Sequence, residues 1–290
     1  MTNPDKPSGR KLEPHAPPVK LAALEAGLDV LQPERPRADD FVARIAELDP
    51  DVATVVAYGK LLPRELLEVP RLGFVNVHFS LLPLYRGAAP VQRCLIDGCT
   101  RTGAAIMLLT EGMDEGPVLA VQEVEVSPDE DAGALGARLA KIGAPLLVDS
   151  LHGYAEGTLQ PREQDHSSAT YAPKITNEET QIDWTQSAIA IRNLIRGLSP
   201  TPGAWTTLKG ARLKVFRAEP AHLVTRAGEG PAPLVLEPGE IRTTLGLHVG
   251  TGSGALDLTD VQLAGKRRMS GAELVRGLRI TPGETFERHD

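Results

Sequence analysis

Three short runs of the sequence are apolar on both faces, and they constrain the fold more than any other feature. They are residues 51–58 (DVATVVAY), 73–78 (GFVNVH) and 103–109 (GAAIMLL). A strand without a polar face has to be covered on both sides, as in the parallel sheets of α/β proteins. Residues 90–96 have a helical pattern between the last two runs. The sequence therefore predicts a β-α-β alternation and an α/β, Rossmann-like parallel sheet.

The remaining pattern divides the chain near residue 165. Residues 160–168 (QPREQDHSS) have almost nothing to bury and predict a linker. We expect an α/β domain over residues 1–165 and a second domain over residues 166–290. Short strands with turn signals predict a small barrel or sandwich in the second domain. The expected elements are helices at 20–27, 41–48, 132–154 and 187–198, and strands at 118–126, 204–208, 212–218, 239–249 and 255–263, with 1–18 as a loop.

Composition excludes several classes of protein. The 290 residues carry a net charge of −7, which excludes a protein that binds polyanions over its whole surface. Cys94 and Cys99 are the only cysteines, and no second pair completes a metal site, so we expect reduced thiols. No run approaches the ~18 apolar residues of a membrane span, and the start has no signal-peptide core. The expectation is a soluble, cytoplasmic protein without a metal.

Asn76 and His78 are candidate catalytic residues. They lie two apart at the end of a predicted strand, so their side chains share one face. Ligands of parallel α/β sheets bind beyond the carboxyl ends of the strands. An amide and an imidazole there can hold the oxyanion of a tetrahedral intermediate, and the imidazole can move a proton. A hydrogen-bonded pair that merely caps the loop is the alternative.

Asp114 is the third candidate. It lies in Gly-Met-Asp-Glu-Gly (residues 112–116), where flanking glycines allow a tight turn. One β-α-β unit separates it from Asn76, so we expect it at the same sheet edge, where a carboxylate would fix the imidazole tautomer. The sequence offers no serine in a nucleophile elbow and no thiol with a paired base. This pattern favours direct acyl transfer onto an incoming nucleophile.

Several motifs in one order resemble the folate-dependent formyltransferases, and among them the methionyl-tRNA formyltransferases. They are NVHFSLLPLYRGAAPVQR (76–93), TEGMDEGPVL (110–119), YAPKITNEETQIDW (171–184), IRGLSPTPGAW (195–205), VVAYGKLLP (55–63) and PDKPSGR near the start. The resemblance covers nearly the whole chain. It implies transfer of a formyl group from 10-formyltetrahydrofolate to the α-amine of methionyl initiator tRNA.

The resemblance also implies what individual residues do. Asn76, His78 and Asp114 would be the catalytic triad, and the second domain would be an OB-like barrel that binds tRNA. The loop that contacts the folate would comprise Ser80, Leu81, Leu82 and Pro83. The residues that contact tRNA would be Arg10, Lys266, Arg267 and Arg268. From the residues alone, an exposed loop arginine with no partner is the better interpretation of Arg10, and a solvated basic turn is an equal alternative for residues 266–268. We expect a monomer.

The chain departs from the family at its start. Family members have a strand–helix–strand unit before the PDKPSGR loop, and this chain begins inside that loop. We expect the edge of residues 51–58 to lie open, and Met1 to be a mis-assigned start or a truncation. Phe79, Leu84 and Thr201 also stand where the family has other residue types. Two alternatives stay open: a formyltransferase for a sugar-nucleotide amine, and a non-catalytic remnant that binds folate or tRNA.

Overall fold

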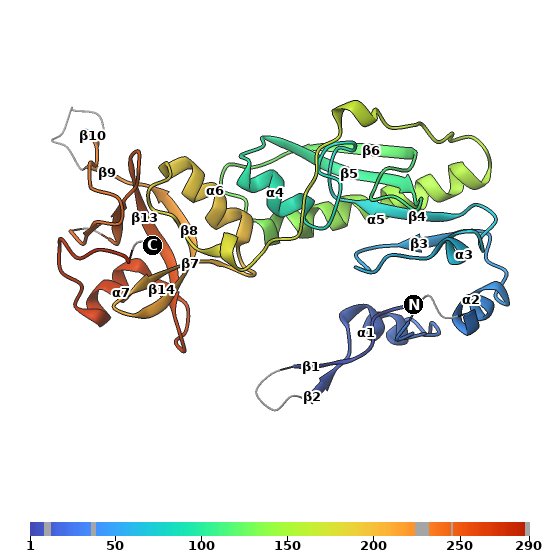
Figure 1. Cartoon of the computed structure of the whole chain (residues 1–290), viewed down its shortest axis with the longest axis horizontal. Coiled ribbons are helices and arrows are strands. Elements are labelled where there is room, and N and C mark those ends of the chain that lie inside the picture. Colours follow the sequence, from blue (N-terminus) through green and yellow to red (C-terminus); the bar gives the residue numbers. More distant parts are fainter. Residues whose placement is uncertain (9–12, 36–38, 224–231, 245, 288–290) are drawn as a thin grey trace. The chain divides into compact units, whose positions relative to one another are not determined.

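The chain forms two compact units (Figure 1). The computed structural model describes all residues except 9–12, 36–38, 224–231, 245 and 288–290. The first unit combines Met1–His78, Ala104–Gln122 and Gly143–Ala169, and the second combines Phe79–Gly103, Glu123–Ile142 and Thr170–Asp290. The first contains a mixed sheet and the second an antiparallel sheet.

The mixed sheet has the strand order β3-β4-β5-β6. Its strands are β3 (Ala53–Val55), β4 (Phe74–His78), β5 (Arg101–Leu108) and β6 (Val118–Glu125). β4 runs parallel to β3, and every residue of β4 is buried, as its two-sided apolar pattern predicts. The covered strand β4 carries Asn76 and His78.

The predicted parallel direction of residues 103–109 is wrong. β5 is antiparallel to β4, with Ala105 opposite His78 and Leu108 opposite Val75. The sequence could not show this, because a strand covered on both faces is apolar throughout in either direction. β5 therefore leaves the sheet at the opposite end of β4 from His78. The sequence predicted that Asp114 would reach His78 at a shared carboxyl edge of the sheet, and this route is excluded.

β3 is an edge strand, and it is shorter than the predicted strand over residues 51–58. Among the described residues it pairs only with β4, and Val56 beside it is 51% exposed. The expectation of an open edge here is confirmed for this part of the chain. Unpaired backbone groups along a strand are sites at which another strand can add.

The elements outside the mixed sheet largely follow the predicted pattern. Residues 1–18 are an exception, because β1 and β2 form a hairpin in which Pro7 faces Pro14. Two prolines can face each other at a non-hydrogen-bonded position of an antiparallel pair, because no backbone N–H is donated between the strands there. The elements are β1 (Lys6–Ser8), β2 (Glu13–His15), α1 (Pro18–Glu25), α2 (Asp39–Ala46), α3 (Arg64–Leu67), α5 (Ala132–Ala155) and η1 (His166–Ser168).

The helices of the second unit have recognisable ends. α4 (Pro90–Ile96) has proline at its start, and after it Gly98 adopts φ 75 while its N–H bonds to the Leu95 carbonyl. Ser187 caps α6 (Ala188–Leu198), and a capping box of Ser270 starts α7 (Gly271–Leu278). A short 3-10 turn, η2, spans Glu178–Thr180.

The second unit is built on an antiparallel sheet of order β11-β12-β13-β8-β7, with β14 paired to β13. Trp184 and Phe286 stack in its core with ring centroids 5.2 Å apart. The predicted strand over 239–249 is instead two strands, β11 and β12, which pair with each other. The strands are β7 (Ala204–Leu208), β8 (Ala211–Pro220), β11 (Ile241–Arg242), β12 (His248–Gly250), β13 (Ala255–Leu263) and β14 (Met269–Ser270), and a separate ribbon pairs β9 (His222–Leu223) with β10 (Ala232–Pro233).

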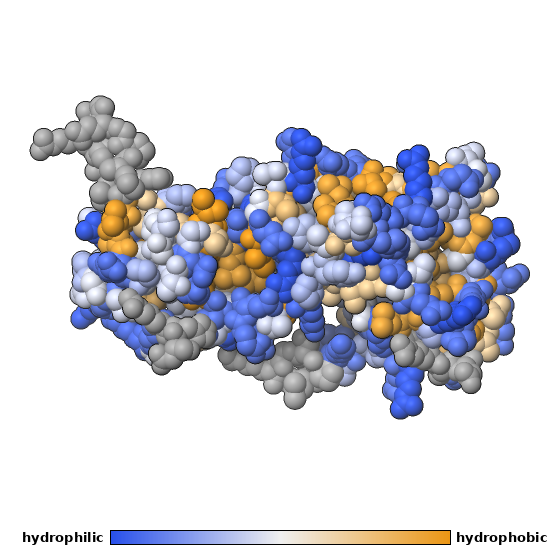
Figure 2. All heavy atoms as spheres, turned by 45° about the horizontal axis from the view of Figure 1, so that its top comes forward, coloured by the Kyte–Doolittle hydropathy of each residue, from blue (hydrophilic) through white to orange (hydrophobic). Residues whose placement is uncertain are grey.

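None of the described helices is both long enough and apolar enough to cross a bilayer. On the face in Figure 2, hydrophilic side chains separate the apolar ones into several patches.

An ion pair in the second unit gives a test of this packing. Arg93 of α4 donates to both carboxylate oxygens of Glu179, at 2.6 and 3.0 Å, and also to the Pro173 carbonyl. Arg93 lowers the pKa of Glu179 to about 2, so the pair contributes stability above pH 4.5 and loses it as the pH falls towards 2.

Glu179→Gln should therefore lower stability at neutral pH by about 1 kcal/mol, and the difference from the wild type should shrink between pH 4.5 and 2. Thermal melts of both proteins across this range measure it. Glu123→Gln, which breaks the exposed Arg101–Glu123 pair, is the control and should change little. A difference that stays constant with pH would contradict the assignment.

Candidate active site

Asn76 and His78 point from one face of β4. They are 9% and 5% exposed, so the sequence prediction of two polar groups on a covered strand is confirmed. Asn76 lies between Val55 of β3 and Met107 of β5. Within the described residues its carboxamide has no hydrogen-bond partner, so both of its N–H groups are without an acceptor.

Asp114 meets His78. Its Oδ2 lies 3.6 Å from His78 Nδ1, and only 17% and 6% of the two side chains are exposed. This distance is within ion-pair range and slightly beyond a hydrogen bond, and such contacts tighten when substrate binds. The carboxylate stands on the Nδ1 side of the ring, from which it can fix the orientation and tautomer of the imidazole.

The loop between β5 and β6 brings Asp114 back to His78. Backbone bonds from Leu109 N–H to the Phe74 carbonyl and from Leu108 N–H to the Pro117 carbonyl close its base. Asp114 itself has φ 50, in the left-handed region, whereas the flanking glycines do not. Aspartate tolerates this conformation better than most residues.

Gly116 is required for close approach rather than for unusual dihedral angles. A Cβ atom there would overlap the carbonyl oxygen of Leu108. A Cβ at Gly112 would meet only the carboxylate end of Glu115, an exposed side chain that can move. The two glycines of the motif therefore differ in what they permit.

Sequence reasoning missed Gln164, which lies in the predicted linker. Its side chain is buried at 7% exposure, and its Nε2 donates to the carbonyls of Asp114 at 3.0 Å and Gly116 at 2.7 Å. Arg162 and Val118 exchange backbone bonds of 2.8 and 2.9 Å beside it. The expectation that residues 160–168 bury almost nothing is confirmed except at Gln164, because a polar sequence does not reveal a glutamine that satisfies buried carbonyls.

The loop that follows His78 is held by its own unit. Ser80 is buried, and its hydroxyl donates to the Leu84 carbonyl at 2.6 Å. Further along, Arg86 N–H bonds to the Thr170 carbonyl and Ala172 N–H to the Arg86 carbonyl, at 2.9 and 2.7 Å. Leu81, Leu82 and Pro83 remain partly exposed on this loop, as a ligand-contacting surface requires.

The cysteines give no nucleophile. Cys94 is fully buried, and burial raises the pKa of its thiol to about 12. The hydroxyl of Tyr85 donates to Asp97 at 2.9 Å and lies 3.0 Å from Cys99 Sγ, and burial raises the pKa of this tyrosine. The described residues contain no group of three side chains able to hold a metal ion.

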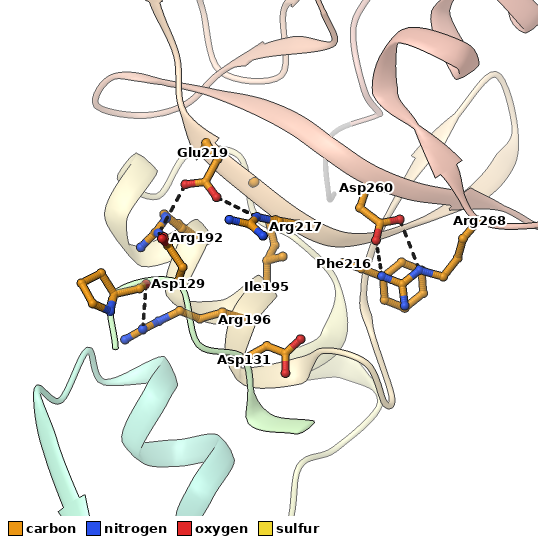
Figure 3. A pocket seen from close by; sticks show the side chains of 12 residues that line it. Asp129, Asp131, Arg192, Ile195, Arg196, Phe216, Arg217, Glu219, Asp260 and Arg268 are labelled. Carbon is orange, nitrogen blue, oxygen red and sulfur yellow. Dashed lines mark hydrogen bonds and ion pairs between the residues drawn. The ribbon is translucent and has the colours of Figure 1, made fainter. Parts of the chain in front are cut away.

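The predicted tRNA contacts have different surroundings. Arg10 lies outside the described residues. Lys266 and Arg267 follow β13, and Arg267 is 80% exposed in its side chain with a 3.4 Å contact to Glu273. Arg268 pairs with Asp260 and lies over the Phe216 ring, 4.0 Å from its centroid (Figure 3).

Arg268 faces a charged cavity of about 230 Å³ in the second unit (Figure 3). Four arginines line this cavity opposite four carboxylates: Arg192, Arg196, Arg217, Arg268, Asp129, Asp131, Glu219 and Asp260. Arg192 reaches Asp129 at 2.7 Å, and Glu219 lies between Arg192 and Arg217. The cavity lining therefore has no net charge to attract an anion.

Comparison with known proteins decides the family. The formyl transferase model matches residues 1–151, and the model for the formyl transferase C-terminal domain matches residues 174–279. Methionyl-tRNA formyltransferase from Streptomyces griseus is 46% identical over 98% of this chain and 89% of its own length. The enzyme from Geobacter metallireducens is 43% identical over 98% of this chain and 88% of its own length. The chain belongs to the methionyl-tRNA formyltransferase family.

Solved structures share the fold of this methionyl-tRNA formyltransferase family member. HypX from Aquifex aeolicus, in complex with tetrahydrofolic acid, aligns with TM-score 0.62 at 19% identity over 86% of this chain and 41% of HypX. Methionyl-tRNA formyltransferase from Clostridium thermocellum aligns with TM-score 0.52 at 20% identity over 66% of this chain and 81% of its own. At these identities the likeness concerns the fold alone.

The two glycines of the Asp114 loop give the next prediction. Gly116→Ala should lower thermal stability and reduce formyl transfer at least tenfold, because the new Cβ displaces the loop from Leu108 and moves the Asp114 carboxylate. Gly112→Ala is the matched control and should stay within about twofold of wild type, because only the Glu115 side chain has to move. Melting curves and kcat measure both effects. Equal losses in the two variants would show that the close approach at Gly116 does not position Asp114.

Proposed function

We propose that the chain transfers the formyl group of 10-formyltetrahydrofolate to the α-amine of methionyl initiator tRNA, for the initiation of protein synthesis. Family membership at above 40% identity supports this activity. The observation that carries the mechanism is the group of Asn76, His78 and Asp114, in which a buried amide shares a strand with a buried imidazole that has its own carboxylate. We also propose that the protein acts in the cytoplasm as a monomer.

The residues present fit the formyl donor. Asn76 of the first unit supplies N–H donors on a buried strand. Leu81 and Leu82 of the second unit are partly exposed and offer apolar surface of the kind that a flat ring system contacts. Ser80 does not need to bind ligand directly, because its hydroxyl holds the Leu84 carbonyl and so fixes the shape of the loop. Folate contact by residues 80–83 is part of the proposal.

Asn76 and His78 act on the charge that develops during transfer. Tetrahydrofolate carries the formyl group as an amide-like carbonyl, so attack by an amine places negative charge on its oxygen. N–H groups from Asn76 and His78 stabilise that oxyanion in a site shielded from water. Asp114 keeps the imidazole oriented. As the tetrahedral intermediate collapses, the bond from the formyl carbon to the folate nitrogen breaks, and His78 can move the proton that the attacking amine loses to that nitrogen, which leaves as an amine. An α-amine with a pKa of about 7.7–8.0 is partly neutral at cell pH, so no strong base is required.

The experiment is formyl transfer from 10-formyltetrahydrofolate to methionyl initiator tRNA. Asn76→Ala and His78→Ala should each lower kcat about 10²- to 10³-fold, because each removes a group that contacts the oxyanion. Asp114→Asn should lower kcat while leaving KM for both substrates nearly unchanged. Asp97→Asn is the control, since Asp97 is exposed and contacts Tyr85 instead. Transfer to an amino-sugar nucleotide in place of the tRNA would overturn the proposed acceptor.

Residues 166–290 form the tRNA-binding domain in this proposal, and residues 1–165 form the catalytic domain. The C-terminal family model over residues 174–279 supports the division. Lys266 and Arg267 are the cations best placed for phosphate contacts, because Lys266 has no carboxylate partner among the described residues and Arg267 is largely exposed. Arg268 is already neutralised by Asp260. Arg10 remains a proposed contact to the acceptor end of the tRNA.

Substitutions in this basic turn should separate binding from folding. Lys266→Ala and Arg267→Ala should each weaken tRNA binding and make the slope of log K against log salt shallower by about 0.7–0.9. Arg268→Ala should instead lower thermal stability, because it removes both the Asp260 pair and the stacking on Phe216. Binding titrations at several salt concentrations and melting curves distinguish these results. Unchanged salt slopes for Lys266→Ala and Arg267→Ala would place the tRNA elsewhere.

A further inference from the structure

We infer that Gln164 is a positioning residue for catalysis, which acts by holding the backbone of the Asp114 loop. The inference rests on the proposed function of Asp114. Gln164 lies 50 positions from Asp114 in the chain, yet its side-chain amide donates to that residue's carbonyl at 3.0 Å and to the Gly116 carbonyl at 2.7 Å. Both N–H groups of the amide are therefore used on the loop that carries the carboxylate.

The register of the neighbouring backbone explains how a glutamine reaches both carbonyls. Arg162 and Val118 form an isolated antiparallel bridge, with bonds of 2.8 and 2.9 Å between their backbones. In an antiparallel pair, the residue two positions after one partner lies opposite the residue two positions before the other partner. Gln164 therefore comes level with Gly116, and its side chain donates where a strand backbone would otherwise pair.

Burial makes these two bonds consequential. Gln164 is 7% exposed, and its bond to Gly116 lies wholly inside the protein. Without the amide, the Gly116 carbonyl would be a buried acceptor that no water reaches, so the loop would have to move to find another donor. The left-handed backbone of Asp114 at φ 50 adds to this, because even aspartate, which tolerates that region better than most residues, adopts it less readily than the ordinary regions.

A small movement of this loop acts directly on the catalytic pair. The distance of 3.6 Å between Asp114 Oδ2 and His78 Nδ1 is close to the limit of an ion pair, so an increase of one ångström would break the contact. Misplacement of a catalytic group by about 1 Å can cost about 10²-fold in rate. Gln164 thus fixes how closely the carboxylate approaches the imidazole.

Gln164→Met tests this, because an unbranched side chain of similar length fills the space without donating. We expect kcat for formyl transfer to fall about tenfold to hundredfold, with KM for the folate and the tRNA within about twofold of wild type. Gln160→Met is the matched control. Gln160 also donates to a backbone carbonyl, that of Gly157 at 2.9 Å, but it is exposed and does not contact the Asp114 loop.

A double-mutant cycle separates positioning from a general structural effect. If Gln164 acts through Asp114, Gln164→Met should add almost nothing to the loss caused by Asp114→Asn. Equal factors in the two backgrounds would overturn the inference. Gln164→Glu is the second variant if Gln164→Met does not fold, and its carboxylate, facing two carbonyl oxygens, should lower kcat further.

Hydrogen exchange gives a readout that does not depend on activity. Peptides covering residues 109–118 should exchange faster in Gln164→Met than in wild type or Gln160→Met, because the loop opens more often. Unchanged exchange together with unchanged kcat would overturn the inference. If Asp114→Asn keeps the kcat of wild type, the proposed function of Asp114 is wrong. If Asp114→Asn lowers kcat and Gln164→Met does not, only the positioning role of Gln164 is wrong.

Discussion

The candidate site depends on a left-handed backbone conformation that is unfavourable for most L-amino acids. Asp114 has φ 50, and this conformation turns the loop after β5 so that the carboxylate reaches His78. Two features maintain it: the bare backbone of Gly116 against the Leu108 carbonyl, and the side-chain amide of Gln164. A conformation that is locally unfavourable persists only where its surroundings determine it, and such sites are often functional.

The segment that joins the two family domains has structural contacts on both sides of residue 165. Before it, Arg162 and Gln164 hold the loop of Asp114. After it, Thr170 and Ala172 exchange backbone bonds with Arg86, in the loop that carries the proposed folate contacts. Each loop is thus anchored within its own unit by a different part of one connecting segment.

The sequence predicted which of these polar residues lie close together better than it predicted the direction of the strands. Alternation alone placed Asn76 and His78 on one face, and the Gly-x-Asp-x-Gly turn placed Asp114 near them. They meet through a loop that returns to His78, and not through the shared carboxyl edge that the sequence predicted. The direction of β5 was not predictable, because parallel and antiparallel strands covered on both faces have the same apolar pattern. The sequence did not indicate Gln164, because its side chain binds carbonyls about 50 positions away in the chain, and no local pattern reveals such contacts.

The bridge between Arg162 and Val118 limits how the connecting segment can change in length. Side chains alternate along an extended chain, so one residue inserted between Arg162 and Gln164 would turn the amide away from Gly116. One residue inserted near Gly157, before the bridge, would leave that register intact. The segment can therefore accept an insertion before the antiparallel bridge at Arg162, but not between Arg162 and Gln164.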